Sequence, residues 1–574
     1  MKTILRSGFV LALAAVCGAQ NRDAEFGKLA DRYFDEAVFR FDPVQATSAG
    51  FHQPYDALLP SGSRAEIEAQ IAALHQWEKT VENFDPRGLS GWVSSDRELV
   101  LASIHSQLLS LESIRDWEKN PDRYSSGITN AIYTIMSRNY APAAERLRAV
   151  IARERLIPRV FQSARENLKN PPQIYTEIAL EQLPGLVSFF QRDVPEAFRE
   201  VKDAHLLGEF QESNRAVIGD LRAYGDWMKS DLLPRSHGDF RIGAENYRKK
   251  LLYDEMVDVP LDRLLEIGYT DLHRNQAEFR KVAAEIDAKR TPQQILDNLE
   301  RDHPPANKLL DSFRDVLSGL REYITVHHIV TIPSTTPPII EESPPFMRAL
   351  TTASMDTPGP YEKDKEAFFN VTLPEPGWPA KQKEEYLEGL DRGTIISTAI
   401  HEAYPGHYVQ FLWLQGVPTK TRKLIAVGSN AEGWAHYCEQ MMLDEGYGNG
   451  DLKLRLGQLQ DALLRDARYI VGIQMHTQRM TLAEGIDFFV KEGYQTRPMA
   501  EKEAKRGTSD PTYLVYTLGK LEILKLRDDY KRIKGAQYSL EAFHDAFLKQ
   551  GAPPVKIVRR ALLGNGLGND SPVL

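Results

Sequence analysis

The chain has 574 residues, of which 42% are hydrophobic and 26% are charged, so it carries enough apolar material for a large buried core and is not a disordered chain. Its formal net charge is −9 and it contains no long basic run. We therefore do not expect nucleic acid among its partners.

The first residues have the pattern of an export signal. Lys2 and Arg6 form a charged start, an apolar run covers residues 9–16, and small residues continue to Ala19. The run is too short to span a bilayer, so we predict a signal peptide over residues 1–19 and an exported protein, periplasmic or extracellular. Cleavage would remove two positive charges and no negative ones, which changes the formal net charge from −9 to −11.

The sequence contains two cysteines, Cys17 and Cys438. Cys17 gives the alternative of a lipid anchor and a lipoprotein, although the preceding Val16 departs from the usual small residue. Cleavage would leave Cys438 alone, so no intramolecular disulfide is expected. Cys438 lies in an apolar helical pattern that is typical of a small core residue. No later apolar run is long enough for a transmembrane helix.

Residues 20–320 are expected to form an N-terminal helical region. In residues 24–39 the apolar side chains recur at helical spacing. Similar patterns predict helices over four further segments, residues 64–81, 95–117, 142–170 and 260–287. Clusters of proline and glycine separate these segments.

The middle of the chain has a different character. Residues 324–332 are rich in β-branched side chains and residues 367–374 are a second strand candidate, with a proline-rich stretch at 333–360 between them. We predict a small sheet with long loops here, and helices again from residue 380. His327 and His328 are neighbours on the first predicted strand and would point to opposite faces, so we do not expect them to share a metal.

The segment His401–His407 reads His-Glu-Ala-Tyr-Pro-Gly-His and follows an apolar helical stretch. In zinc peptidases the histidines of a His-Glu…His motif bind the metal, and the glutamate, here Glu402, activates a water. The second histidine stands at i+6, which on an ideal helix lies ~240° away, on the wrong face. Pro405 interrupts helical hydrogen bonding and Gly406 tolerates unusual dihedrals. We therefore expect a bulge that returns His407 to the side of His401.

A helix beginning near the capping residues Ser429 and Asn430 is expected to supply the third ligand. One face of this helix carries three ionisable residues at i, i+4 and i+7, namely Glu432, His436 and Glu439. Such residues are costly to bury among apolar neighbours unless something pairs with them, and a divalent metal would do so. We predict that Glu432 binds the metal and that His436 and Glu439 orient the ligands. If the chain instead turns outward after Pro405, His436 would replace His407.

Two later helices carry candidates for substrate contacts. The helix over about residues 451–478 places four residues on one stripe, Arg465, Arg468, Gly472 and His476. An arginine there would bind a substrate carboxylate or an acidic group at the metal, or form a buried ion pair, and His476 is a candidate oxyanion group. A further helix, capped near Ser509-Asp510-Pro511, carries Tyr516, Lys520 and Arg527 on one face, and the Tyr516 hydroxyl suits stabilisation of a developing oxyanion.

These motifs resemble a known family. The segment His401–His407, then Glu432-Gly433-Trp434-Ala435, then Tyr516, Gly519-Lys520 and Leu526-Arg527 are similar to the bacterial domain-of-unknown-function 885 family. That family resembles the gluzincin metallopeptidases, which include helical carboxypeptidases and dipeptidases of the angiotensin-converting-enzyme type. The resemblance implies a zinc site with His401, His407 and Glu432 as ligands and Glu402 as the base. The six-residue spacing of the histidines departs from the ordinary gluzincin pattern.

Together these features predict a mainly α protein, a large two-lobed helical bundle with a small β-sheet beside a central metal-site cleft. Residues 321–574 would form the catalytic region of one continuous body, with the 367–373 strand along one wall of the cleft. The predicted function is Zn²⁺-dependent hydrolysis of short peptides, with Glu402, Arg468, His476 and Tyr516 as catalytic residues. Two alternatives stay open, a metal-dependent hydrolase of another amide and a catalytically inactive binding protein.

Overall fold

The computed structural model describes residues 21–343, 348, 352–363 and 365–564. The predicted signal peptide and Cys17 lie outside these residues. Within the described part of the chain, no helix combines the length and the apolar character that crossing a membrane requires.

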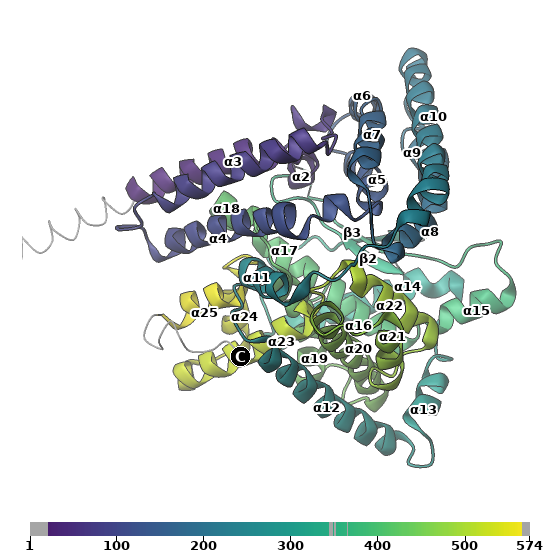
Figure 1. The fold of residues 1–574 in the computed structure, drawn as a ribbon. Coiled ribbons are helices and arrows are strands. Elements are labelled where there is room, and N and C mark those ends of the chain that lie inside the picture. The colour runs from purple at the N-terminus through teal and green to yellow at the C-terminus, as the bar shows by residue number, and fades with distance from the viewer. Residues whose placement is uncertain (1–20, 344–347, 349–351, 364, 565–574) are drawn as a thin grey trace, which may run out of the picture.

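The N-terminal part is helical, as the apolar spacing predicts (Figure 1). A helix over residues 21–33 continues directly into η1. The elements that follow are, in chain order, η1 (Phe34–Phe39), α2 (Pro43–Ala49), η2 (Tyr55–Ala57), α3 (Arg64–Glu82), α4 (Gly91–Leu108), η3 (Leu109–Ile114), η4 (Asp116–Glu118), α5 (Asp122–Met136), α6 (Ala143–Glu154), α7 (Ile157–Asn167), α8 (Gln173–Ser188), η5 (Phe189–Asp193), α9 (Val194–Ala197), α10 (Ala204–Trp227), η6 (Met228–Leu232) and η7 (Leu233–Arg235).

The rest of the chain contains further helices and one small sheet. Its elements are α11 (Gly243–Glu255), α12 (Leu261–Ile286), α13 (Pro292–Leu299), η8 (Ala306–Lys308), α14 (Leu309–Val326), β1 (Ile339–Glu342), β2 (Ala353–Asp356), β3 (Phe368–Val371), α15 (Ala380–Glu388), α16 (Arg392–Glu402), α17 (His407–Gln415), α18 (Lys420–Leu424), α19 (Gly428–Asp444), α20 (Leu452–Thr477), α21 (Leu482–Lys491), α22 (Arg497–Ser509), α23 (Val515–Lys534), η10 (Gly535–Gln537), α24 (Leu540–Leu548) and α25 (Val555–Leu563). The prediction of a mainly α fold with a small sheet is confirmed.

The sheet has the strand order β1-β3-β2. Strand β3, which corresponds to the predicted strand at 367–374, pairs in parallel with β1 and antiparallel with β2. The two outer strands come from the proline-rich stretch. Because β3 is the central strand, both of its edges are occupied, so this strand cannot serve as a cleft wall that pairs with a peptide by edge hydrogen bonds.

The strand predicted at 324–332 does not form. Helix α14 continues to Val326, and the chain then turns at His327 and His328. The buried side chains of α14 recur every three to four residues as Phe313, Leu317, Leu320 and Ile324. This burial continues the helix through residues whose β-branched side chains favour a strand, because packing outweighs local propensity.

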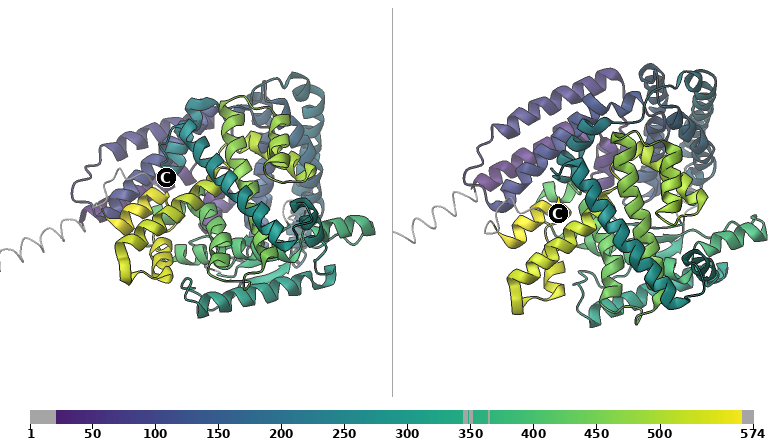
Figure 2. Two further views of the ribbon diagram at one scale, coloured as in Figure 1. Left: turned by 90° about the horizontal axis from the view of Figure 1, so that it is seen from below. Right: turned by 60° about the horizontal axis from the view of Figure 1, so that its bottom comes forward.

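Two groups of helices pack around separate cores. One group comprises the helices from residue 21 to η7, in the upper part of Figure 1, and the other contains α16, α19, α20 and α23 below it. Helices α11 and α12 precede residue 320 but pack in one core with α20 and α23. Figure 2 shows α12 running across this second group. The predicted boundary at residue 320 itself falls inside α14.

Candidate metal centre

Helix α16 ends at Glu402, and the following four residues form a tight turn before α17 begins at His407. Pro405 has no N–H to continue the helix. The Gly406 N–H donates to the Ile400 carbonyl at 3.0 Å, and a side chain at Gly406 would collide with the His401 carbonyl. The indole N–H of Trp434 in α19 donates to the Pro405 carbonyl at 2.9 Å. The predicted break is confirmed, and it turns the chain back toward α16.

The turn brings His401, His407 and Glu432 together. One ligand atom from each residue lies within 4.8 Å of the other two. The Nε2 atoms of both histidines lie 3.4 Å from Oε2 of Glu432, and the two imidazole rings are nearly perpendicular, with centroids 4.8 Å apart. The chain therefore does not turn outward after Pro405, and His436 does not replace His407.

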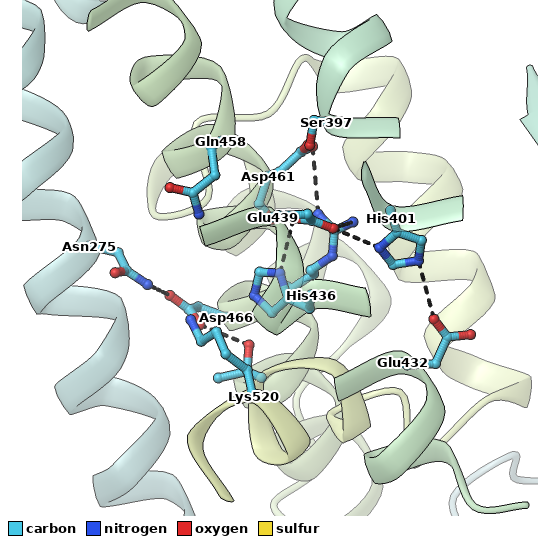
Figure 3. Close-up of polar contacts among 12 residues, drawn as sticks. Asn275, Ser397, His401, Glu432, His436, Glu439, Gln458, Asp461, Asp466 and Lys520 are labelled. Atoms are coloured by element: carbon cyan, nitrogen blue, oxygen red, sulfur yellow. Dashed lines mark hydrogen bonds and ion pairs between the residues drawn. The ribbon is translucent and has the colours of Figure 1, made fainter. Parts of the chain in front are cut away.

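Glu439 supports this group from behind (Figure 3). Its Oε1 atom accepts hydrogen bonds from Nδ1 of His401 at 2.7 Å and from Arg465 at 2.9 Å. Its Oε2 atom lies 3.0 Å from Nδ1 of His436. Glu439 and His436 are fully buried. The carboxylate fixes the ring of His401 with Nε2 directed at Glu432, which is how an outer partner orients a metal-binding histidine.

A second buried ion pair joins two other helices, α12 and α23. Lys520 of α23 donates to Asp271 of α12 at 2.9 Å, and both are almost fully buried. Asp466 of α20 accepts from Asn275 at 2.7 Å and from Thr517 at 2.9 Å. These contacts link the helix that carries Tyr516 to α12 and α20. Lys520 is thus a structural residue in the core, and it does not reach the candidate metal ligands.

The electrostatics of the group favour a cation. Burial alone would lower the pKa of His401, but the nearby carboxylates of Glu432 and Glu439 outweigh it and raise the pKa to about 10. Despite burial, the neighbouring histidines hold the pKa of Glu432 well below its usual value. Burial lowers the pKa of His436 to about 3, so that ring is neutral. The carboxylates that favour a proton on His401 would also favour a divalent cation in place of that proton.

Glu402, the predicted base, lies at the end of α16 beside strand β2. Its Oε2 atom accepts a hydrogen bond from the Met355 N–H at 3.2 Å. Strand β2 is an outer strand of the sheet and packs against α16. The strand beside the candidate site is therefore β2 and not β3. The sequence of this four-residue strand shows no alternation of apolar and polar residues, and sequence reasoning therefore missed it.

Tyr516 lies next to His401, with the two rings at a small angle of 24° and their centroids 6.5 Å apart. Three guanidinium groups lie 5.1–5.9 Å from the centre of the tyrosine ring, those of Arg465, Arg468 and Arg506. Arg506 donates to the Tyr516 hydroxyl at 3.4 Å. Sequence reasoning missed Arg506, because α22 gave no signal that it reaches this ring.

Arg465 and Arg468 form ion pairs within the protein. Arg465 contacts Glu439 behind the metal group. Arg468 donates two hydrogen bonds to Glu503, at 2.7 and 2.8 Å, and both side chains are nearly buried. Of the options open from the sequence, the ion pair is therefore the one observed. Both arginines also border the ring of Tyr516, so they position that side chain.

The structure does not bring His476 to the site. Its Nε2 atom lies 2.8 Å from the Gly507 carbonyl, and burial lowers its pKa to about 4. It stands eleven residues after Arg465 on α20, ~16 Å along the helix axis, so a shared stripe does not mean a shared site. Arg527 likewise lies away from the group, with its guanidinium against Tyr437.

The predicted capping residues at two helix starts are also wrong. Helix α19 is preceded by Val427 and has no side-chain cap. The Ser429 N–H donates to Glu255, and the Asn430 amide donates to the Pro553 carbonyl. Ser509 ends α22 and α23 begins only at Val515. The carboxylate of Asp510, expected at a helix cap, accepts hydrogen bonds from Arg506 instead.

The comparisons with known proteins identify the family. The sequence model of one protein family, described as "Bacterial protein of unknown function (DUF885)", matches residues 43–562. The chain belongs to this family. No curated protein matches it.

Two solved structures share the fold. One, from Shewanella oneidensis, is described as "a putative lipoprotein of unknown function". It is 26% identical and has a TM-score of 0.79, and the alignment covers 94% of this chain and 99% of that one. The other, "the putative lipoprotein from Colwellia psychrerythraea", is 17% identical with a TM-score of 0.78 over 95% and 98% of the two chains. The second likeness concerns the fold alone.

Proposed function

We propose that this DUF885 protein is a zinc-dependent hydrolase that cleaves peptide bonds in short peptides. The observation that carries the proposal is the spacing of the three candidate ligands. Both histidine Nε2 atoms lie 3.4 Å from the Glu432 carboxylate oxygen, which is longer than an ordinary N–H···O hydrogen bond. Two ligands at zinc distance from one ion, at a tetrahedral angle, are ~3.4 Å apart.

The residues fit zinc in other respects as well. Two imidazoles and one carboxylate are a donor set found at catalytic zinc sites, where a fourth position stays open. His401 is oriented through Nδ1 by Glu439. His407 packs its ring against Phe411, with centroids 5.9 Å apart. When bound, zinc supplies Lewis acidity that activates water and polarises a carbonyl group.

The other residues then take distinct roles. Glu402 accepts a proton from the attacking water and later donates it to the leaving amine. The Tyr516 hydroxyl donates a hydrogen bond to the oxygen on which negative charge develops, and Arg506 orients that hydroxyl. Arg465 and Arg468 hold Glu439 and the tyrosine ring in place.

Strand β2 supplies a wall for an extended substrate. It is an outer strand, and the Met355 N–H points away from β3 toward Glu402. A peptide could align along this edge through main-chain hydrogen bonds, a mode that suits an extended short peptide and excludes a folded protein. The resemblance of the His401–His407 motif to gluzincin peptidases supports the same reaction.

Export forms part of the proposal. The charged and apolar start of the sequence supports a signal peptide over residues 1–19. The solved structure from Shewanella oneidensis is described as a putative lipoprotein, which supports the alternative of a lipid anchor at Cys17. Either form would place the hydrolase outside the cytoplasm.

Mass-spectrometric mapping of a mixed peptide library tests the function. We expect cleavage by the purified protein, loss of cleavage with a chelator, recovery with zinc, and cleavage slowed by ~10²–10⁴-fold in a Glu402→Gln variant. Cleavage of acylated amino acids but not of peptides would assign another amide as substrate. Stoichiometric zinc without any hydrolysis would point to a binding protein and overturn the proposal.

A further inference from the structure

His52 lies in the N-terminal group of helices, in the segment between α2 and η2, and its imidazole joins two carboxylates. Nδ1 lies 3.2 Å from Asp56, and Nε2 lies 3.1 Å from Glu362 in the connection between β2 and β3. The ring stacks on Tyr140 at a centroid distance of 3.4 Å. Burial alone would lower the pKa of His52, but hydrogen bonds with Asp56 and Glu362 raise it to about 9, so the bridge is charge-assisted.

The N-terminal end of this bridge is rigidly held. Asp56 is buried and also accepts hydrogen bonds from Thr47 at 2.8 Å and Tyr140 at 2.7 Å. Thr47 in turn accepts from the fully buried Arg153 at 2.7 Å. The carboxylate that anchors His52 is therefore fixed by α2, α6 and the segment after α5.

The other end of the bridge is the tip of the β2–β3 connection, residues 359–362. The Tyr361 N–H donates to the Ala49 carbonyl at 2.9 Å, and its ring lies 4.5 Å from that of Phe51. A side chain at Gly359 would collide with the Ser48 carbonyl. The tip thus lies directly against residues 48–52.

Both ends of the connection are held as well. Arg138 forms an ion pair with Asp356, the last residue of β2, and donates to the Glu366 carbonyl at 2.6 Å. Met355, the residue before Asp356, donates its N–H to Glu402. A continuous set of contacts therefore runs from the N-terminal helices through the connection to the predicted base.

We propose that His52 is a positioning residue for the Glu402 site: it clamps the β2–β3 connection to the N-terminal helices and so holds strand β2 against Glu402. If the clamp is lost, β2 moves while His401, His407 and Glu432 stay in place, because those ligands come from α16, α17 and α19. Only the effect on kinetics rests on the proposed function.

Hydrogen exchange of the full-length protein tests the clamp without reference to activity. In His52→Gln we expect amides of residues 352–363 to exchange about tenfold to a hundredfold faster, the factor for losing one hydrogen bond to a charged group. Gly359→Ala should produce the same local change by steric displacement. In Glu362→Gln the side chain can still accept a hydrogen bond from Nε2 of His52. The exchange rates of residues 352–363 in this variant should therefore lie between those of the wild type and those of Glu362→Ala.

The matched control is His75→Gln. His75 also bridges two carboxylates, those of Glu78 and Glu112, but it lies on α3 away from the connection. It should leave exchange at residues 352–363 unchanged. Unchanged exchange there in both His52→Gln and Gly359→Ala, or an equal rise throughout the protein, would overturn the proposal.

Kinetics give the second readout. With peptide substrates, His52→Gln should raise KM at least about fivefold and lower kcat by a smaller factor, because the substrate wall moves and Glu402 loses its contact with Met355 while the three candidate ligands stay in place. A roughly fivefold fall in kcat with an unchanged KM would contradict the assigned role. Absence of peptide hydrolysis in the wild type would overturn the proposed function, and the exchange experiment would still decide the clamp.

Discussion

Two groups of histidine and glutamate side chains among the described residues bring potential ligand atoms within 4.8 Å of one another. One is His401, His407 and Glu432. The other consists of Glu78 and Glu82 on α3 with His105 on α4. By composition and spacing alone both are candidate metal sites, so the difference between them must come from what surrounds the ligands.

The surroundings differ in two ways. At α3 and α4, Nε2 of His105 lies 3.0 Å from Glu78, an ordinary hydrogen-bond distance, and the His105 side chain is 30% exposed, against 12% for His401. Around His401 the distances to Glu432 are longer, at 3.4 Å, and a buried carboxylate paired with Arg465 fixes the histidine. Surface side chains that already hydrogen-bond to one another gain little free energy by binding a metal instead. Side chains that a buried hydrogen-bond partner holds in a fixed orientation are preorganised to bind one.

The largest expected difference between the two groups is in metal content. We expect about one zinc per wild-type chain, and a loss of nearly all of it in His401→Ala and in His407→Ala, because two remaining ligands hold zinc weakly. His105→Ala should leave the zinc content unchanged. Metal analysis of the purified proteins measures this. The comparison fails if the wild type lacks a stoichiometric transition metal or if His105→Ala loses as much as His401→Ala.

The next effect separates metal binding from turnover. Glu402→Gln should keep its zinc and lower kcat by ~10²–10⁴-fold, because glutamine is nearly the same shape but cannot accept the water proton. The control is Glu82→Gln, a glutamate of the other group, which should leave kcat unchanged. Steady-state hydrolysis of a short peptide gives both values. Retention of most activity in Glu402→Gln would exclude this residue as the base.

A smaller effect tests the support behind the ligands. Glu439→Gln should weaken zinc binding ~10–100-fold, the usual range for losing an outer partner of a metal-bound histidine. Competition with a chromophoric chelator measures the affinity. Glu78→Gln should leave it unchanged. Because Glu439 also pairs with buried Arg465, thermal unfolding of metal-free protein is measured in parallel, and equal loss of stability with unaltered zinc affinity would assign Glu439 a purely structural role.

Much of the candidate centre could be predicted because its signals are local. Pro405 and Gly406 predict a helix break within six residues, and the spacing of Glu432 and Glu439 places both on one helical face. These arguments need only the geometry of one helix or one turn. The grouping of the three candidate ligands and the position of Glu439 followed from them, while zinc binding itself stays a prediction.

The errors arose where distant contacts decide the outcome. His476 shares a stripe with Arg465, but it contacts the Gly507 carbonyl of α22 and not the candidate site. The first three residues of the strand predicted at 324–332 became the end of α14, because its buried face packs as a helix. The bridge from His52 to Glu362 joins residues 310 positions apart, and no pattern within either segment reveals it. Tertiary packing, which one sequence does not display, fixed each of these.

The smallest expected effect concerns His75, which contacts Glu78 of the surface group, and the dependence of its contribution to stability on pH. Hydrogen bonds with Glu112 and Glu78 raise the pKa of His75 above its usual value, so the protonated ring stabilises the folded state. This stabilisation is fully present below the unfolded-state pKa of about 6.5 and is lost as the pH rises through the higher folded-state value. Because the side chain is 44% exposed, solvent screening limits the contribution to ~0.2–1 kcal/mol.

Thermal unfolding of the wild type and of His75→Gln at pH 5.5 and pH 9 measures this contribution. The variant should be slightly less stable than the wild type at the lower pH, and the difference should shrink at the higher pH. High salt should reduce the difference at pH 5.5, since exposed charges are screened. A difference that grows with pH would reverse the assigned sign. A loss of several kcal/mol would mean that the contacts of the α3–α4 group are as tightly built as the buried contacts of Glu439 with His401, His436 and Arg465. The contrast between the two groups would then no longer support the proposal that only one of them binds zinc.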